Sequence, residues 1–177
     1  MRKIHVGRSL AICAFLALPL AAADYNWKAN QLKHWPSSYE FTLTVANAMP
    51  DSGYSYIPPS TAKPVERTYA GLMIHIGVFN DGMMKLVTGM DGPTPPPPAS
   101  TDKAAVIQFL KDSQQFAMKA LNAVTEEQLN KTVKFGGIEE TGREAIEGAF
   151  AHMAHTRGQC EVYLRLQNIL PPKYPFE

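Results

Sequence analysis

Apolar residues recur at three- and four-residue steps in four long stretches, and this spacing predicts four helices. The predicted helices span residues 36–48, 65–87, 101–122 and 141–168. The second helix has the clearest apolar stripe, formed by Leu72, Ile76, Phe79, Met83 and Leu86. Prolines and glycines separate the helices, and four consecutive prolines precede the third. The pattern predicts an all-α fold, an antiparallel four-helix bundle with long connections, in which the proline run is an extended spacer.

Shorter signals fall between the predicted helices. Residues 24–33 form a polar lead-in, and residues 51–64 form a loop marked by glycine and proline. The sequence from Thr125 to Gln128 matches a capping box, which predicts a short extra helix. Residues 132–135 alternate in polarity and predict a short strand or extended arm, which Gly136 ends. The chain shows neither an internal repeat nor a second domain.

The start of the chain has the pattern of an export signal. Arg2, Lys3 and Arg8 precede an apolar run over residues 9–20, and Ala21-Ala22-Ala23 supplies the small residues of a cleavage site. The run is too short and too uneven for a transmembrane helix. We therefore expect a signal peptide at residues 1–23, a bundle domain at 24–177, and a periplasmic or secreted protein that is not stably inserted in the membrane. An uncleaved membrane anchor is the alternative.

The charge balance and the cysteine content limit the expected partners and the expected disulfide bonds. Without the predicted signal, 14 basic residues face 16 acidic ones, with no basic block or stripe. This balance excludes nucleic acid as an expected partner, because binding phosphates requires clustered positive charge. Cys160 would be the only cysteine left, so no intramolecular disulfide is expected. We expect a buried thiol that acts as a small apolar group, with a reactive thiol as the alternative.

Three histidines carry the most specific chemical signal. His152 and His155 lie three residues apart on the fourth predicted helix, and His75 lies on the second. Imidazoles from two helices of a bundle are a common way to bind a divalent metal and leave a position open. Residues at i and i+4 share a helix face best, but Thr156 occupies that position after His152. The alternative is that the histidines are ordinary, partly buried residues with hydrogen-bond partners.

Several further residues share the face of His152 on a helical wheel. At about 100° per residue, they all fall within about 60° of His152. They are Ala145, Ala149, Thr156, Gln159 and Tyr163. Thr156, Gln159 and Tyr163 are candidates to contact a substrate or to orient the metal ligands. Their alternative role is hydrogen bonding inside the bundle.

Residues 152–172 resemble the last helix of the DinB-like superfamily, a group of four-helix-bundle proteins. The resemblance rests on His152, on Arg157-Gly158-Gln159, and on the Val-Tyr-Leu-Arg-Leu segment that ends at Pro171-Pro172. His75 in Met-Ile-His-Ile-Gly is similar to the family's first metal ligand. The loop from Ala48 to Pro58 is similar to the family's connection between helices one and two. The resemblance covers residues 35–172.

Carried over residue by residue, the resemblance implies His75 and His152 as metal ligands. The family's third ligand falls on Thr156, and His155 is the neighbouring histidine. Three outcomes are open at this point. His155 rotates in and completes the site, Thr156 and water form a weakened site, or the fold persists without metal binding. We favour the site of His75, His152 and His155.

The resemblance implies zinc, nickel, iron or manganese as the metal, and a low-molecular-weight thiol as a further cofactor. Some relatives are thiol-dependent transferases or isomerases. We therefore expect metal-assisted transfer or hydrolysis of a small substrate. The alternative is a non-catalytic binding or stress-response bundle with a degenerate metal site. A homodimer is a further candidate, through an outer apolar face of Met73, Met84 and Val87.

Overall fold

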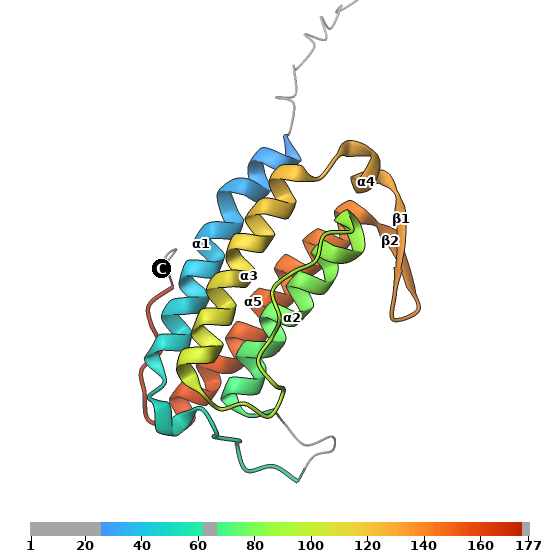
Figure 1. Cartoon of the computed structure of the whole chain (residues 1–177). Helices are drawn as coiled ribbons and strands as arrows, with labels where there is room; N and C mark the ends of the chain where they lie inside the picture. Colours follow the sequence, from blue (N-terminus) through green and yellow to red (C-terminus); the bar gives the residue numbers. More distant parts are fainter. Residues whose placement is uncertain (1–25, 62–66, 175–177) are drawn as a thin grey trace, which may run out of the picture.

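The computed structural model describes residues 26–61 and 67–174. The predicted signal peptide lies outside these residues and stays a prediction. Figure 1 shows the long helices side by side, with a small hairpin at one end. The elements in chain order are α1 (Trp27–Ala48), η1 (Asp51–Gly53), α2 (Tyr69–Thr88), α3 (Lys103–Ala123), α4 (Glu126–Asn130), β1 (Thr132–Phe135), β2 (Ile138–Thr141) and α5 (Gly142–Leu166). The predicted all-α four-helix bundle is confirmed.

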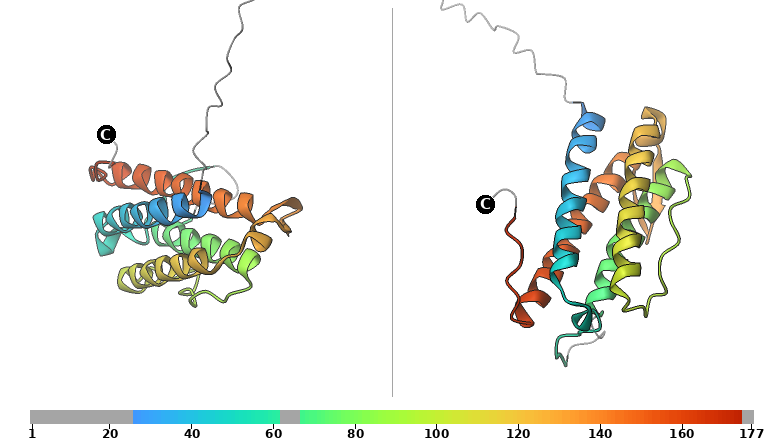
Figure 2. Two further views of the ribbon diagram at one scale, coloured as in Figure 1. Left: turned by 90° about the horizontal axis from the view of Figure 1, so that it is seen from above. Right: turned by 60° about the vertical axis from the view of Figure 1, so that its left-hand side comes forward.

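The directions of the four helices follow from contacts near their ends. Lys103 at the start of α3 donates to the carbonyl of Met49, just after the end of α1, so α1 and α3 are antiparallel. In α2 and α5, Tyr69 contacts Tyr163 and His75 contacts His152, which is also an antiparallel order. Figure 2 shows the long helices packed side by side from two further directions.

Helices α2 and α3 run in the same direction. The proline run between them was expected to connect antiparallel helices, so this expectation was wrong. A Cβ added to Gly77 would meet Phe109, and Asp81 accepts a hydrogen bond from Ser113, so both positions increase together. The proline-rich connection makes this possible, because it returns along the bundle to the end at which α2 began (Figure 1). Its Gly92 lies against Asp81 and Phe116, where a side chain would be tightly packed.

The first helix begins about nine residues before its predicted start. Asn26 caps α1 by accepting from the amide of Ala29, and Pro36 lies inside the helix rather than at its beginning. Trp27, Gln31 and Trp35 are buried at four-residue steps, and the Trp35 indole donates to the Gln31 side chain. The expected polar lead-in was therefore wrong. Tertiary burial of two tryptophans outweighs the missing amide of one proline.

The other helix ends differ less from prediction. Thr68 caps α2, so the helix begins a few residues after the predicted start at 65, which lies outside the described residues. Asp102 rather than Thr101 caps α3. Thr141 caps α5 in a full capping box with Glu144, a signal that the sequence reading missed.

The segment between α3 and α5 folds as a short helix and a β-hairpin. The predicted capping box of Thr125 and Gln128 is present and opens α4. The predicted strand is β1, and it pairs antiparallel with β2, which was not predicted. Gly136 and Gly137 form the two-residue turn with φ values of 56° and 84°, a conformation that suits glycine and matches the twist of a tight hairpin.

The core surrounds α2, which is buried on most of its circumference. Met73, Met84 and Val87 are among its buried residues, so the outer apolar face proposed for a homodimer was wrong. The dimer itself stays a prediction. Cys160 is fully buried, and burial raises the pKa of its thiol, as expected for a structural cysteine. In the two described ranges, no helix combines the length and apolar character needed to cross a membrane.

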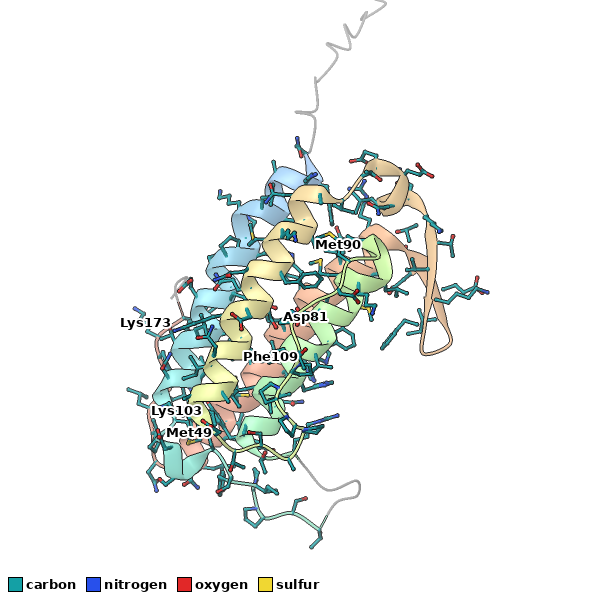
Figure 3. The ribbon with its side chains drawn as sticks, in the orientation of Figure 1. Met49, Asp81, Met90, Lys103, Phe109 and Lys173 are labelled. Atoms are coloured by element: carbon teal, nitrogen blue, oxygen red, sulfur yellow. The ribbon has the colours of Figure 1, made fainter. Side chains whose placement is uncertain are left out.

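Asp81 is an unusual member of the α2–α3 interface. Figure 3 labels it on α2, with Phe109 nearby on α3. The residue is 8% exposed, the Ser113 hydroxyl donates to its Oδ2 at 2.7 Å, and its Oδ1 has no hydrogen-bond partner in the described chain. Burial raises the pKa of the Asp81 carboxyl to about 7, and the hydrogen bond from Ser113 offsets only part of this shift.

The raised pKa predicts that Asp81 costs stability at alkaline pH. The folded state binds this proton more tightly than the unfolded state, so the cost is full above pH 7 and disappears as the pH falls through 3.8. Asp81→Asn keeps an acceptor for Ser113 and removes the charge. We expect the variant to be more stable than the parent by about 1–3 kcal/mol at pH 8, with a difference that shrinks toward pH 4. Urea unfolding of both proteins at several pH values measures this, and a difference that is independent of pH would contradict the assignment.

Candidate functional site

Two of the three predicted metal ligands face each other across the α2–α5 interface. His75 projects from the middle of α2 and His152 from the middle of α5, and their ring centroids are 4.8 Å apart at an interplanar angle of 80°. The antiparallel order of the two helices brings these positions to the same level. The sequence prediction that these two histidines share one site is consistent with this geometry.

Phe79 fixes the orientation of the His152 ring. The two rings are stacked with centroids 3.8 Å apart and planes within 20° of parallel. On its other side, Phe79 contacts Phe135 at the tip of the hairpin at 5.7 Å, edge to face. One face of the imidazole is therefore covered by Phe79. The sequence reading placed Phe79 in the core stripe, and no periodic signal distinguishes a core phenylalanine from one that stacks on a ligand.

The environment keeps both imidazoles neutral. Burial lowers the pKa of His152 to about 4, and the nearby His75, His155 and Arg67 add to the shift. Burial and the charge of Arg67 also lower the pKa of His75. Neutral imidazole has a free lone pair for a metal ion or a proton. The pair is thus held at neutral pH in the protonation state that a metal ligand requires.

One nitrogen of His152 lacks a hydrogen-bond partner in the part of the chain that the structure describes. Its Nδ1 atom is buried and makes no hydrogen bond to any described residue. Buried polar atoms are nearly always satisfied, so an orphaned one calls for an explanation such as an ion. A metal ion or a bound ligand at this edge of the ring would supply the missing partner.

His155, the third predicted ligand, lies on the exposed side of α5. Its Nε2 is 3.0 Å from Nε2 of Gln159, one turn later, and the pairing requires the amide to donate to the imidazole. Within residues 26–61 and 67–174, no group of three or more histidine, cysteine or acidic side chains is arranged to hold a metal ion. The structure therefore brings His75 and His152 together, and leaves His155 turned toward Gln159.

The polar face predicted for α5 divides into two parts. Thr156 is 2% exposed and Tyr163 is 6% exposed, so both face the bundle, whereas His155 and Gln159 face solvent. The Tyr163 hydroxyl donates to the carbonyl of Arg67 at 3.0 Å and so anchors the chain just before α2. Tyr163 is therefore a hydrogen-bond donor inside the bundle, which is the alternative role that the sequence analysis gave it.

Two pockets border this region. A pocket of about 460 Å³ adjoins His75, and its lining includes Arg67, Gly71, Ile74 and the Pro98 end of the connection. A second pocket of about 310 Å³ is lined by Pro58, Gln159 and Tyr163 among others, so these two candidate substrate contacts do not line the pocket beside His75. The sequence reading missed Arg67, because a single exposed arginine before a helix has no distinctive pattern.

Comparisons with known proteins agree with this fold. The model of the DinB superfamily matches residues 37–160. A DinB-like protein from Bacillus cereus ATCC 10987 superposes with a TM-score of 0.68 at 18% identity, covering 82% of this chain and 96% of its own. A DinB-like protein from Bacillus subtilis superposes with a TM-score of 0.64 at 20% identity and the same coverage. No curated protein matches the sequence.

The low pKa of His152 is directly measurable. In a proton NMR titration, we expect one imidazole to titrate near pH 4, well below the value of 6.5 for an unperturbed histidine. His75→Ala removes a neighbouring charge and opens the ring to water, so it should raise that midpoint toward 6.5. Titration of every imidazole near 6.5 in the parent protein would refute the account of the site. The signal is assigned by its loss in His152→Ala.

Proposed function

The chain belongs to the DinB superfamily, and from that premise we propose that it is an exported protein that binds one divalent metal ion between α2 and α5. His75 and His152 are the first two ligands, and His155 is the third. Zinc, nickel, iron and manganese are the candidate metals. The observation that carries the proposal is the facing pair of neutral imidazoles with an orphaned nitrogen.

Two of the three proposed ligands, His75 and His152, are placed to bind a divalent metal in this structure, and His155 is not. Two imidazoles with lowered pKa values are good ligands for transition metals, because no proton has to be displaced at neutral pH. The stacked Phe79 holds one ring in place, which reduces the entropy lost on binding. Arg67 opposes a bound cation, but its side chain belongs to an exposed residue, so solvent screens the repulsion.

His155 completes the set by exchanging its contact with Gln159 for the metal. That contact is a single exposed hydrogen bond, which stabilises the present orientation only weakly. Because His155 is three residues from His152, a rotation of its side chain is enough to bring it toward the same edge of the helix. Gln159 then becomes free to hydrogen-bond a ligand or the histidine's other nitrogen.

The pocket beside His75 is the proposed substrate site. Its Arg67 offers a positive charge to an anionic group, and Ile57, Ile74 and Val78 offer apolar contact. The Tyr163 hydroxyl fixes the backbone of Arg67 and so positions that end of the pocket. A divalent metal next to it would act as a Lewis acid and lower the pKa of a coordinated thiol or water. We propose transfer to or hydrolysis of a small substrate, with a low-molecular-weight thiol as the candidate cofactor.

A non-catalytic bundle with a degenerate site is the second candidate. Thr156 stands where the family places its third ligand, and it is buried rather than directed to solvent. His155 pairs with Gln159 in the structure, and the described residues contain no three-ligand group. In that case the histidine pair serves packing, and the protein acts by binding a partner or ligand.

Metal content of matched variants tests the proposal. Purified protein without a His tag, incubated with zinc and passed over a desalting column, should retain about one equivalent by elemental mass spectrometry. His152→Ala should lose that metal and stay helical, because alanine favours the helix. His34→Ala, the same change outside the site, should bind like the parent. Equal metal content in all three proteins would exclude His152 as a ligand.

Thr156→His separates the two candidates. It restores the i, i+4 spacing with His152 that favours metal binding. If His155 completes the natural site, the variant should bind zinc within about tenfold of the parent affinity, as measured by competition with a chelating dye. Tight binding that appears only in Thr156→His would show that the natural site is degenerate, and the second candidate would then stand.

A further inference from the structure

We propose that the cavity around Arg157, on the side of α5 away from the histidine pair, is a binding site for a small organic carboxylate. The cavity measures about 290 Å³. Its lining comes from α1, α5 and the C-terminal segment, and comprises His34, Ser37, Ser38, Phe41, Phe150, Ala154, Arg157 and Tyr174. Figure 3 shows that segment, with Lys173 labelled, returning beside α1.

Arg157 is a buried cation. It is 5% exposed, and burial lowers the pKa of its guanidinium. Its Nη1 donates to the carbonyl and the hydroxyl of Ser38, both at 3.0 Å, and to the Thr42 hydroxyl at 3.2 Å. These neutral oxygens orient one edge of the guanidinium toward α1, and the nearby Glu161 offsets only part of the effect of burial on its pKa.

The other nitrogens of the guanidinium are Nε and Nη2. In the described ranges, Nε and Nη2 donate to no residue, and no carboxylate lies within ion-pair distance of Arg157. A buried charge is costly unless an opposite charge compensates it. Arginine presents paired N–H groups that match the two oxygens of a carboxylate. An anion with that geometry would supply acceptors that the described residues do not give to Nε and Nη2.

The walls of the cavity select an organic anion. The guanidinium carbon lies 4.8 Å from the centroid of Phe41 and 5.9 Å from that of Tyr174, and Phe150 lines the same space. Aromatic rings gain from contact with a hydrocarbon group and give a hydrated inorganic ion little in return. A cavity near 300 Å³ is at the small end of ligand pockets, which favours a compact monocarboxylate.

This site is separate from the proposed metal site. Arg157 lies about 140° around α5 from His152 at 100° per residue, and no residue lines both this cavity and the pocket beside His75. Loss of metal binding would therefore leave this proposal intact. Likewise, failure to bind a carboxylate would say nothing about the histidines.

Benzoate is the probe that tests the proposal. We expect saturable binding to the purified protein, followed by ligand-detected NMR, with a Kd of about 1 mM or below. Ala154→Phe fills the cavity from an exposed helix position without changing Arg157, and should weaken binding at least about tenfold. Ala151→Phe, the same change at an exposed position of α5 that does not line the cavity, is the matched control and should bind like the parent.

Two further experiments test whether the ligand must carry a carboxylate. Arg157→Lys keeps the charge and removes the paired donors, so it should also weaken benzoate binding, with circular dichroism confirming the fold. Benzyl alcohol, which lacks the carboxylate, should not compete. The proposal is overturned if benzoate fails to bind the folded parent, if Ala154→Phe binds it equally well, or if inorganic phosphate displaces it at equal concentration.

Discussion

The antiparallel packing of α5 against α2 is the contact on which the candidate site depends. Along this interface Tyr163 meets Tyr69, His152 meets His75, and Gly142 lies against Val87 so closely that a Cβ would be only 2.9 Å from its side chain. These three contacts, spaced along the interface, fix the register of α2 and α5. A shift of one turn, about 5.4 Å, would separate the histidines and remove the site.

Burial of His75 and His152 at this interface favours metal binding but lowers the stability of the fold. It keeps the imidazoles neutral, because transferring a charge into the bundle costs free energy. It also leaves Nδ1 of His152 without a hydrogen-bond partner among the described residues, which costs stability unless a ligand satisfies this atom. An interface selected only for stability would carry apolar residues at these positions. The pair therefore supports the proposed binding site, which the metal-content experiment tests.

The parts of the fold that local sequence signals determine were predictable. The capping box at Thr125 and the end of the strand before Gly136 appear where the sequence placed them, and Leu72, Ile76 and Met83 of the predicted stripe on α2 are buried. The start of α1 was missed, because its buried face includes the polar Gln31 and the helix continues through Pro36. The parallel order of α2 and α3 was also missed, because a long connection permits either direction.

The candidate site was predictable to the level of helix faces. Sequence spacing placed His75 and His152 on inward edges of two helices, and the structure brings them together. Spacing alone could not predict the orientation of the His155 side chain. That orientation depends on whether the imidazole contacts Gln159, as in this structure, or a bound ligand. The stacking of Phe79 on His152 and the position of Arg67 near the two histidines were not predicted for a related reason, since they depend on tertiary neighbours rather than on spacing.

X-ray absorption spectroscopy of the zinc-loaded protein tests the central claim most directly. The account predicts nitrogen ligands at about 2.0–2.1 Å, with the outer-shell scattering typical of three imidazole rings. His75→Ala and His152→Ala should each abolish that spectrum. Zinc bound through oxygen alone, or an unchanged spectrum in both variants, would contradict the assignment of the α2–α5 histidine pair as a metal site.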